Sequence, residues 1–202
     1  MSNLSKTEIE KIMKTPGEVK GAVFQTDAAY VKEKKGEQGL KLLAQKTKEW
    51  GHPINYEKAS AVAWYPIGLR VLSLLAMQEV FGWGDKEIED LGDQAPKFSF
   101  ILKIMARYFL SKRRGFEESP KYWAMHYNIG ALEAVELSEK KGNTYAIIRL
   151  RDFRVHPILC VYYKGFFRRL TQFVLKTEKA AIEETKCMFS GDAYHEFILK
   201  WE

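Results

Sequence analysis

The sequence predicts an α+β fold in which N-terminal helices pack on a mainly antiparallel sheet of four to five strands. Two observations lead to this prediction. Before Gly130 the apolar residues recur mostly with helical spacing, and after it they alternate as they do in strands. Turn-forming residues then divide the remainder into a C-terminal β-β-α-β-β unit. With 202 residues, we expect residues 1–202 to form a single domain with one core.

The N-terminal part is expected to be mostly helical. Asp27 is a candidate helix N-cap, Gly36 is a weak point within the helix that follows, and Gly51 and Pro53 end that helix. Ser119 and Pro120 form an N-cap and first-turn pair. The expected elements are a helix from Lys6 to Lys14, a strand from Val19 to Gln25, helices from Asp27 to Trp50, Tyr65 to Phe81 and Phe98 to Leu110, and a short helix carrying Tyr122, Trp123 and His126.

Two hairpins and a helix are expected after Gly130. The first hairpin turns at residues 140–143, Lys-Lys-Gly-Asn, and the second turns at Ser190-Gly191-Asp192. Between them Pro157 lies in the first turn of an aromatic helix that ends near Lys176. The four strands are expected at Ala131 to Glu139, Thr144 to Arg151, Lys179 to Met188 and Ala193 to Trp201.

Composition narrows the class of protein. Apolar residues make up 46% of the chain, and the net charge is only +6. The Lys and Arg residues occur in small clusters, each beside carboxylates or within an aromatic stretch. A solvated surface is therefore favoured over a nucleic-acid or lipid-binding face. The polar N-terminus, the charges that interrupt each apolar stretch and the two cysteines predict a cytoplasmic protein without a membrane span or a disulfide framework.

The second hairpin holds the main candidate site. His195 belongs to the more apolar face of its strand, and Cys187 lies as far before Gly191 as His195 lies after it. Cys160 stands early in the preceding helix, which must pack on the sheet, and Glu183 or Glu184 can add a carboxylate. Zinc accepts these ligand types. The alternative interpretation is two small buried cysteines beside a hydrogen-bonded core histidine.

The segment from Glu184 to Ile198 resembles the C-terminal signature of the 4-vinyl reductase domain family. That signature has a carboxylate, a cysteine three residues later, a glycine-containing turn and a second cysteine eight residues after the first. The related sensor domains of phenol-responsive activators bind zinc there with one more cysteine, five residues before a glycine. Cys160 stands five residues before Gly165, and His195 takes the place of the second cysteine.

The resemblance covers roughly Gly130 to Glu202 and implies zinc ligation by Cys160, Glu184, Cys187 and His195. Because Glu184 and Cys187 are three residues apart, a bulge in the strand is required to bring both to one face. The same fold occurs in haem-based nitric-oxide sensors and in vesicle-tethering subunits, so it does not select one function.

The resemblance also implies a ligand cavity between the aromatic helix and the sheet. Its expected lining residues are Tyr163, Phe166 and Phe167, with Tyr108 from the Phe98 to Leu110 helix, although such an aromatic stripe is also typical of a plain core. Other histidines, His52 and His156, are expected to face solvent. His126 is a candidate haem ligand, with an aromatic core as the alternative.

The sequence therefore predicts a non-catalytic sensory or carrier domain for a small apolar or aromatic ligand, signalling through a partner protein or a homodimer. It shows no dinucleotide fingerprint, phosphate-binding loop or nucleophile elbow. The alternatives are an assembly scaffold resembling the tethering subunits, a haem-based gas sensor, and a reductase acting on a tetrapyrrole vinyl group.

Overall fold

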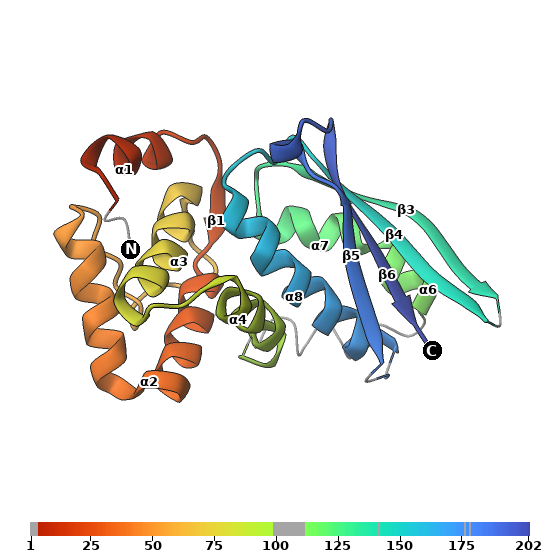
Figure 1. The fold of residues 1–202 in the computed structure, drawn as a ribbon, viewed down its shortest axis with the longest axis horizontal. Helices are drawn as coiled ribbons and strands as arrows, with labels where there is room; N and C mark the ends of the chain where they lie inside the picture. The colour runs from red at the N-terminus through yellow and green to blue at the C-terminus, as the bar shows by residue number, and fades with distance from the viewer. Residues whose placement is uncertain (1–3, 99–111, 141, 176, 178) are drawn as a thin grey trace.

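The computed structural model describes residues 4–98, 112–140, 142–175, 177 and 179–202. Figure 1 shows the helices α1 to α4 on one side of the molecule and a sheet with α6, α7 and α8 on the other. This arrangement confirms the predicted α+β class. The helices are α1 (Lys6–Met13), α2 (Ala22–Glu49), α3 (Ile67–Phe81), α4 (Asp85–Phe98), α6 (Lys112–Glu117), α7 (Ser119–His126) and α8 (Pro157–Leu175).

Strand β1 (Glu18–Lys20) is shorter than the predicted strand, because α2 already begins at Ala22. β1 pairs with β2 (Trp64–Pro66), which occupies the start of the predicted Tyr65 to Phe81 helix. Asp27 is buried inside α2, so its prediction as an N-cap is wrong. The weak point at Gly36 is confirmed, since this residue interrupts α2 with a φ of 68°.

Helix α4 was not predicted, because Gly92 and Pro96 are poor helix formers. The structure gives the reason for the glycine: a Cβ on Gly92 would overlap the Tyr162 carbonyl of α8, and a Cβ on Gly165 would overlap the Glu89 carbonyl of α4. Two glycines thus let α4 and α8 cross in backbone contact. The predicted Phe98 to Leu110 helix lies outside the described residues, apart from Phe98 at the end of α4.

The main sheet has four antiparallel strands in the order β3-β4-β6-β5. Both predicted hairpins are confirmed, although the central pair is β4 with β6. Helix α8 connects β4 to β5 and lies on the sheet's inner face, and Figure 1 shows α4 on the opposite side of α8. The strands are β3 (Ala131–Lys140), β4 (Asn143–Arg151), β5 (Ala180–Lys186) and β6 (Tyr194–Trp201), with a short 3₁₀ turn, Met188–Ser190, between the last two.

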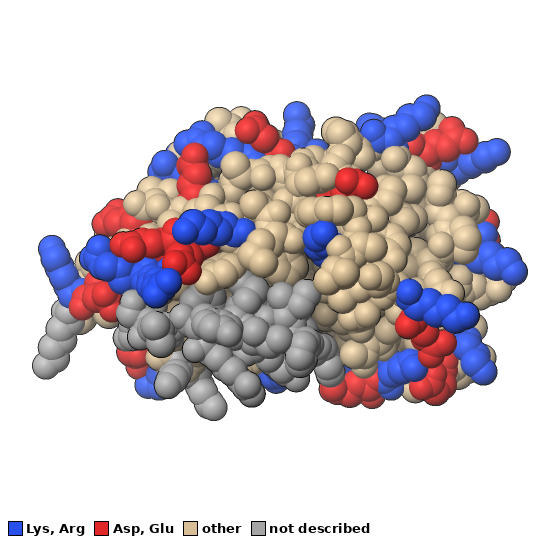
Figure 2. Space-filling view, turned by 180° about the vertical axis from the view of Figure 1, so that it is seen from behind, with Lys and Arg blue, Asp and Glu red and all other residues tan. Residues whose placement is uncertain are grey.

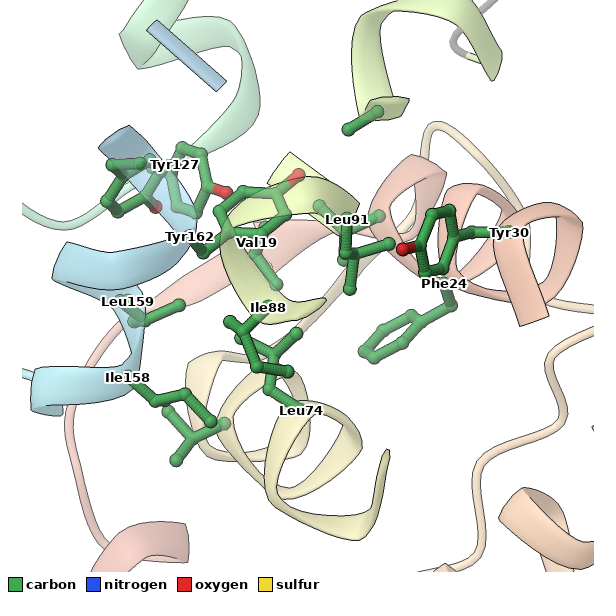
Figure 3. Close-up of a cluster of buried hydrophobic side chains, with 14 of the residues drawn as sticks. Val19, Phe24, Tyr30, Leu74, Ile88, Leu91, Tyr127, Ile158, Leu159 and Tyr162 are labelled. Carbon is green, nitrogen blue, oxygen red and sulfur yellow. The ribbon is translucent and has the colours of Figure 1, made fainter. Parts of the chain in front are cut away.

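A buried ion pair joins α2 to α3 within the core. Arg70 and Asp27 are fully buried and paired, and Ser73 donates a 2.6 Å hydrogen bond to the same Asp27 oxygen. The Arg70 guanidinium also lies 4.4 Å from the centre of the Tyr162 ring of α8. Figure 3 shows Tyr162 pointing into the apolar cluster that includes Leu91 and Ile88 of α4. The pair therefore ties the N-terminal helices to α8.

Helix α7 differs from its prediction in one detail at its start. Its N-cap residue is Glu118, and Ser119 is the first helical residue, so Ser119 is not the N-cap. The Ser119 hydroxyl instead donates to the Phe116 carbonyl at 2.8 Å.

No helix among the described residues is long and apolar enough to cross a membrane. Figure 2 shows that Lys and Arg side chains lie beside Asp and Glu side chains near the edges of one face. The described surface between them carries few charged side chains.

Candidate functional site

The β5–β6 hairpin brings three of the predicted ligands to one face. Lys186 pairs with Glu196, so the next residues in register are Cys187 and His195. His195 faces inward and is 1% exposed. This arrangement follows from the equal spacing of the two residues around Gly191, whose φ of 99° closes the turn.

The pairing of β5 with β6 shifts register between Glu184 and Lys186. This irregularity is the bulge that the three-residue spacing of Glu184 and Cys187 requires. Glu184 is a register partner of inward-facing Phe197, whereas Glu183 lies on the exposed side of β5. Of the two candidate carboxylates, the structure therefore selects Glu184.

The four predicted donor residues converge, with one donor atom from each lying within 4.8 Å of the others. Cys160, in the second turn of α8, places its Sγ 3.9 Å from Cys187 Sγ and 3.7 Å from His195 Nδ1. Glu184 Oε1 lies 3.1 Å from His195 Nδ1. The cluster joins the N-terminal part of α8 to the turn end of the hairpin.

The backbone fixes the orientation of the imidazole. His195 Nε2 lies 3.3 Å from the Phe153 carbonyl, so we assign the ring proton to Nε2, which donates to that oxygen. Nδ1 faces Cys160 Sγ and the Glu184 carboxylate. Histidines that bind metals are commonly held by such a hydrogen bond from the second ring nitrogen.

Burial raises the pKa of Cys160, and nearby Glu184 and Cys187 raise it further. The thiol is 9% exposed and therefore keeps its proton at neutral pH when no cation is present. A divalent cation reverses this preference, because a metal-bound thiol is deprotonated. Binding of a divalent cation through Cys160 would therefore release the thiol proton.

Three separations between donor atoms can be compared with those of tetrahedral zinc. Two sulfurs at about 2.3 Å from one zinc ion lie about 3.8 Å apart, and a sulfur and an imidazole nitrogen lie about 3.6 Å apart. The observed separations in the cluster are 3.9 Å and 3.7 Å. A nitrogen and a carboxylate oxygen on such an ion lie about 3.3 Å apart, against the 3.1 Å between His195 and Glu184. These three separations are close to those expected around one tetrahedral zinc ion, and all four donor atoms lie within 4.8 Å of one another.

A cavity of about 160 Å³ lies between the C-terminal half of α8 and the inner face of the sheet. Its wall is almost entirely apolar. Helix α8 contributes an aromatic and aliphatic stripe, and β4 and β6 contribute alternating inward side chains. The lining includes Phe166, Phe167, Leu170 and Val174 of α8, Ala146 and Ile148 of β4, Leu199 and Trp201 of β6, and Trp123 and His126 of α7.

The predicted ligand residues fall into three groups. Phe166 and Phe167 line the cavity as expected. Tyr163 does not; it lies among the rings of Trp123, Tyr127 and Phe153, one layer behind the wall. Tyr108 lies outside the described residues. The sheet-side lining was missed, although the alternation along β4 and β6 marks those residues as inward-facing.

The remaining histidines are partly buried. His126 lines the cavity, and its Nδ1 lies 3.0 Å from the Tyr122 carbonyl. His52 and His156 are half-buried, which corrects the expectation that both face solvent. His156 Nδ1 accepts a hydrogen bond from the amide of Ile158 and so helps to begin α8.

Comparison with known proteins shows the fold. No family model matches the chain, and no curated protein does, so the resemblance to the 4-vinyl reductase domain stays a prediction. An H-NOX protein from S. oneidensis in the Fe(II)NO ligation state matches 91% of this chain and 99% of its own, with a TM-score of 0.64 and 13% identity.

Two further solved structures agree. An oxygen-binding H-NOX domain related to soluble guanylate cyclases matches 91% of this chain and 95% of its own, with a TM-score of 0.63 and 12% identity. An Fe(II) unliganded H-NOX protein from K. algicida matches 91% of this chain and 96% of its own, with a TM-score of 0.60 and 12% identity. At this identity the likeness concerns the fold alone.

The H-NOX structures raise the question of whether haem fits this chain, since studies of that family concern haem distortion. A cavity of about 150 Å³ in another protein holds benzene. The cavity of about 160 Å³ described above is of that size, whereas haem contains four linked pyrrole rings. The described part of the cavity therefore does not fit haem, although His126 lies in its wall.

Proposed function

We propose that the chain is a sensory or carrier domain that binds a small apolar molecule between α8 and the sheet, with a structural zinc ion beside the binding site. The apolar cavity of about 160 Å³ carries this proposal. Closely packed cores contain few voids larger than a water molecule. A cavity of this size, lined by aromatic and aliphatic side chains, is large enough to hold a compact apolar ligand such as benzene.

The volume sets the size class of the ligand at about one aromatic ring. Few polar groups of the described wall are free to bind it. The hydroxyls of Thr26 and Thr171 donate to the backbone carbonyls of Ala22 and Phe167 at 3.0 and 2.8 Å. Burial of apolar area then supplies most of the affinity.

The zinc ion would stabilise the fold near this site. Cys160 lies in α8 and the other three ligands lie in the β5–β6 hairpin, so an ion bound by all four cross-links helix and sheet. The cavity is lined by the same helix and by β6 farther along. A cross-link at one end of α8 therefore supports the spacing between helix and sheet that forms the cavity.

Ligand binding is tested by thermal unfolding in the presence of one-ring compounds such as benzene, indole and phenol. A ligand at 100 times its Kd stabilises the protein by about 2.7 kcal/mol, which raises Tm by roughly 5–11 °C. The matched control is Leu170→Trp, which fills the cavity and is expected to abolish the shift. Two outcomes contradict the proposal: unchanged melting of the wild type with every compound, or a wild-type shift that persists in Leu170→Trp.

Zinc binding is tested by elemental analysis of protein purified without a metal-affinity tag, with about one zinc per chain expected. Cys187→Ser is expected to lose the ion and to lower Tm, because structural zinc binding is coupled to folding. Glu183→Gln is the control, since Glu183 faces away from the cluster. A zinc content near zero in wild-type protein refolded with excess zinc rejects this part.

The proposed signal would pass to a partner protein or to a second copy of the chain. Size-exclusion chromatography with light scattering, run with and without a stabilising ligand, measures this directly. A ligand-dependent change in mass supports a sensory role through self-association. An unchanged monomer that captures no partner in the ligand-bound state favours a carrier.

A further inference from the structure

We infer that Cys187 and Cys160 form an oxidisable pair, in which a peroxide oxidises Cys187 and Cys160 closes a disulfide. The observation is the direct contact of the two Sγ atoms, which lie 3.9 Å apart. Both cysteines are free thiols. The inference concerns the thiols themselves and applies to the protein with or without a bound ion.

The two cysteines differ in access, and this difference sets the order of the reaction. Cys160 is 9% exposed, so its sulfur is largely shielded from a dissolved oxidant. Cys187 is half-buried at the end of β5, next to the 3₁₀ turn. A peroxide therefore reaches Cys187 first, and Cys160 is the resolving thiol.

The reaction balances with hydrogen peroxide as the two-electron oxidant. The Cys187 sulfur attacks one peroxide oxygen, the O–O bond breaks, and Cys187 becomes a sulfenic acid with release of water. The Cys160 sulfur then attacks the Cys187 sulfur, the S–S bond forms, the S–O bond breaks, and a second water leaves. The proton of the Cys160 thiol leaves in this second water.

The geometry allows the bond with a small movement. The sulfurs must approach from 3.9 Å to about 2.05 Å. Cys160 is held in α8, whereas Cys187 follows an irregularity in β5 and begins a turn that Gly191 closes. The turn end of the hairpin can supply the shift. Because both sulfurs are ligands in the proposed zinc site, disulfide formation would also release a bound zinc ion.

The test treats the folded protein with hydrogen peroxide and follows free thiols and intact mass. Wild-type protein is expected to lose both thiols and two hydrogen atoms per chain, and no disulfide-linked dimer is expected to form. Zinc-loaded protein is expected to react more slowly and to release its zinc in step with thiol loss. Added oxygen atoms in place of the loss of two hydrogens, or thiols that survive the treatment, overturn the inference.

Single variants separate the two roles. Cys160→Ser is expected to stop at the sulfenic acid of Cys187, which a 1,3-diketone traps, and Cys187→Ser is expected to leave Cys160 unreactive. Equal trapping at Cys160 in the second variant contradicts the assigned order. Zinc content measured beforehand keeps the two proposals apart. A disulfide in protein that never binds zinc rejects the zinc site alone, and bound zinc with no disulfide rejects this inference alone.

Discussion

The buried ion pair of Asp27 and Arg70 offers a sharp test of how the helices are held together. Oδ2 of Asp27 accepts hydrogen bonds from Arg70 and Ser73, and Oδ1 has no partner among the described residues. Arg70→Met keeps most of the side-chain volume but leaves a fully buried carboxylate with one hydrogen bond. Removing one partner of such a pair costs about 3–5 kcal/mol. For a chain of this length, Tm falls by roughly 6–20 °C.

The destabilisation caused by Arg70→Met is expected to depend on pH. Burial raises the pKa of Asp27, and Arg70 opposes that rise in the wild type. Without Arg70 the rise is unopposed, so the folded variant binds a proton at Asp27 more tightly than the unfolded chain does. The destabilisation is therefore largest at neutral pH, where Asp27 is charged, and shrinks as the pH falls into the range in which the folded variant protonates it.

The assay is urea unfolding followed by circular dichroism at several pH values. The double variant Asp27→Leu with Arg70→Met is expected to recover most of the stability, because apolar replacement of a buried pair is often neutral or favourable. Lys179→Met, which breaks an exposed pair with Glu202, is the matched control and is expected to change little. A cost below about 1 kcal/mol for Arg70→Met at neutral pH, or a double variant no more stable than the single, refutes the reasoning.

The other predictions use the helix crossing and a histidine. Gly165→Ala places a Cβ against the Glu89 carbonyl and is expected to cost about 1–3 kcal/mol in urea unfolding, whereas Gly84→Ala, which meets nothing closer than 3.7 Å, should cost less. Equal costs would contradict backbone contact between α4 and α8. Burial lowers the pKa of His126, so wild-type stability is lost as the pH falls below about 6.5. His126→Gln is expected to flatten that slope, and an unchanged slope would exclude His126 as its source.

The sequence was most informative where the structure is local. Alternation along β6 and the equal spacing around Gly191 placed His195 inward and opposite Cys187, since a short hairpin turn sets the register of its strands. The bulge was predicted from the three-residue spacing of Glu184 and Cys187, because residues three apart on a regular strand face opposite sides of the sheet. The register shift after Glu184 confirms this bulge, so the geometry within one hairpin could be predicted from residue spacing alone.

Features set by partners distant in the sequence were not predictable in this way. Asp27 has the composition of an N-cap, and only the position of Arg70, 43 residues later, makes a buried carboxylate stable. Gly92 reads as a helix breaker until α8 lies against it. Tyr163 shares the aromatic stripe with Phe166 and Phe167, but the placement of α7 decides which of these rings line the cavity.

The strand order gives the four-stranded sheet a particular sequence of assembly. Each outer strand forms a hairpin with its central neighbour, and these two units can form early because their strands are close in the sequence. The central pairing joins residues such as Leu150 and His195 across a long loop that contains α8. Loop closure of that length is slow to nucleate. Cys160 reaches Cys187 and His195 only when α8 packs against the β5–β6 hairpin, so contact between these side chains can report on a step of folding that follows hairpin formation.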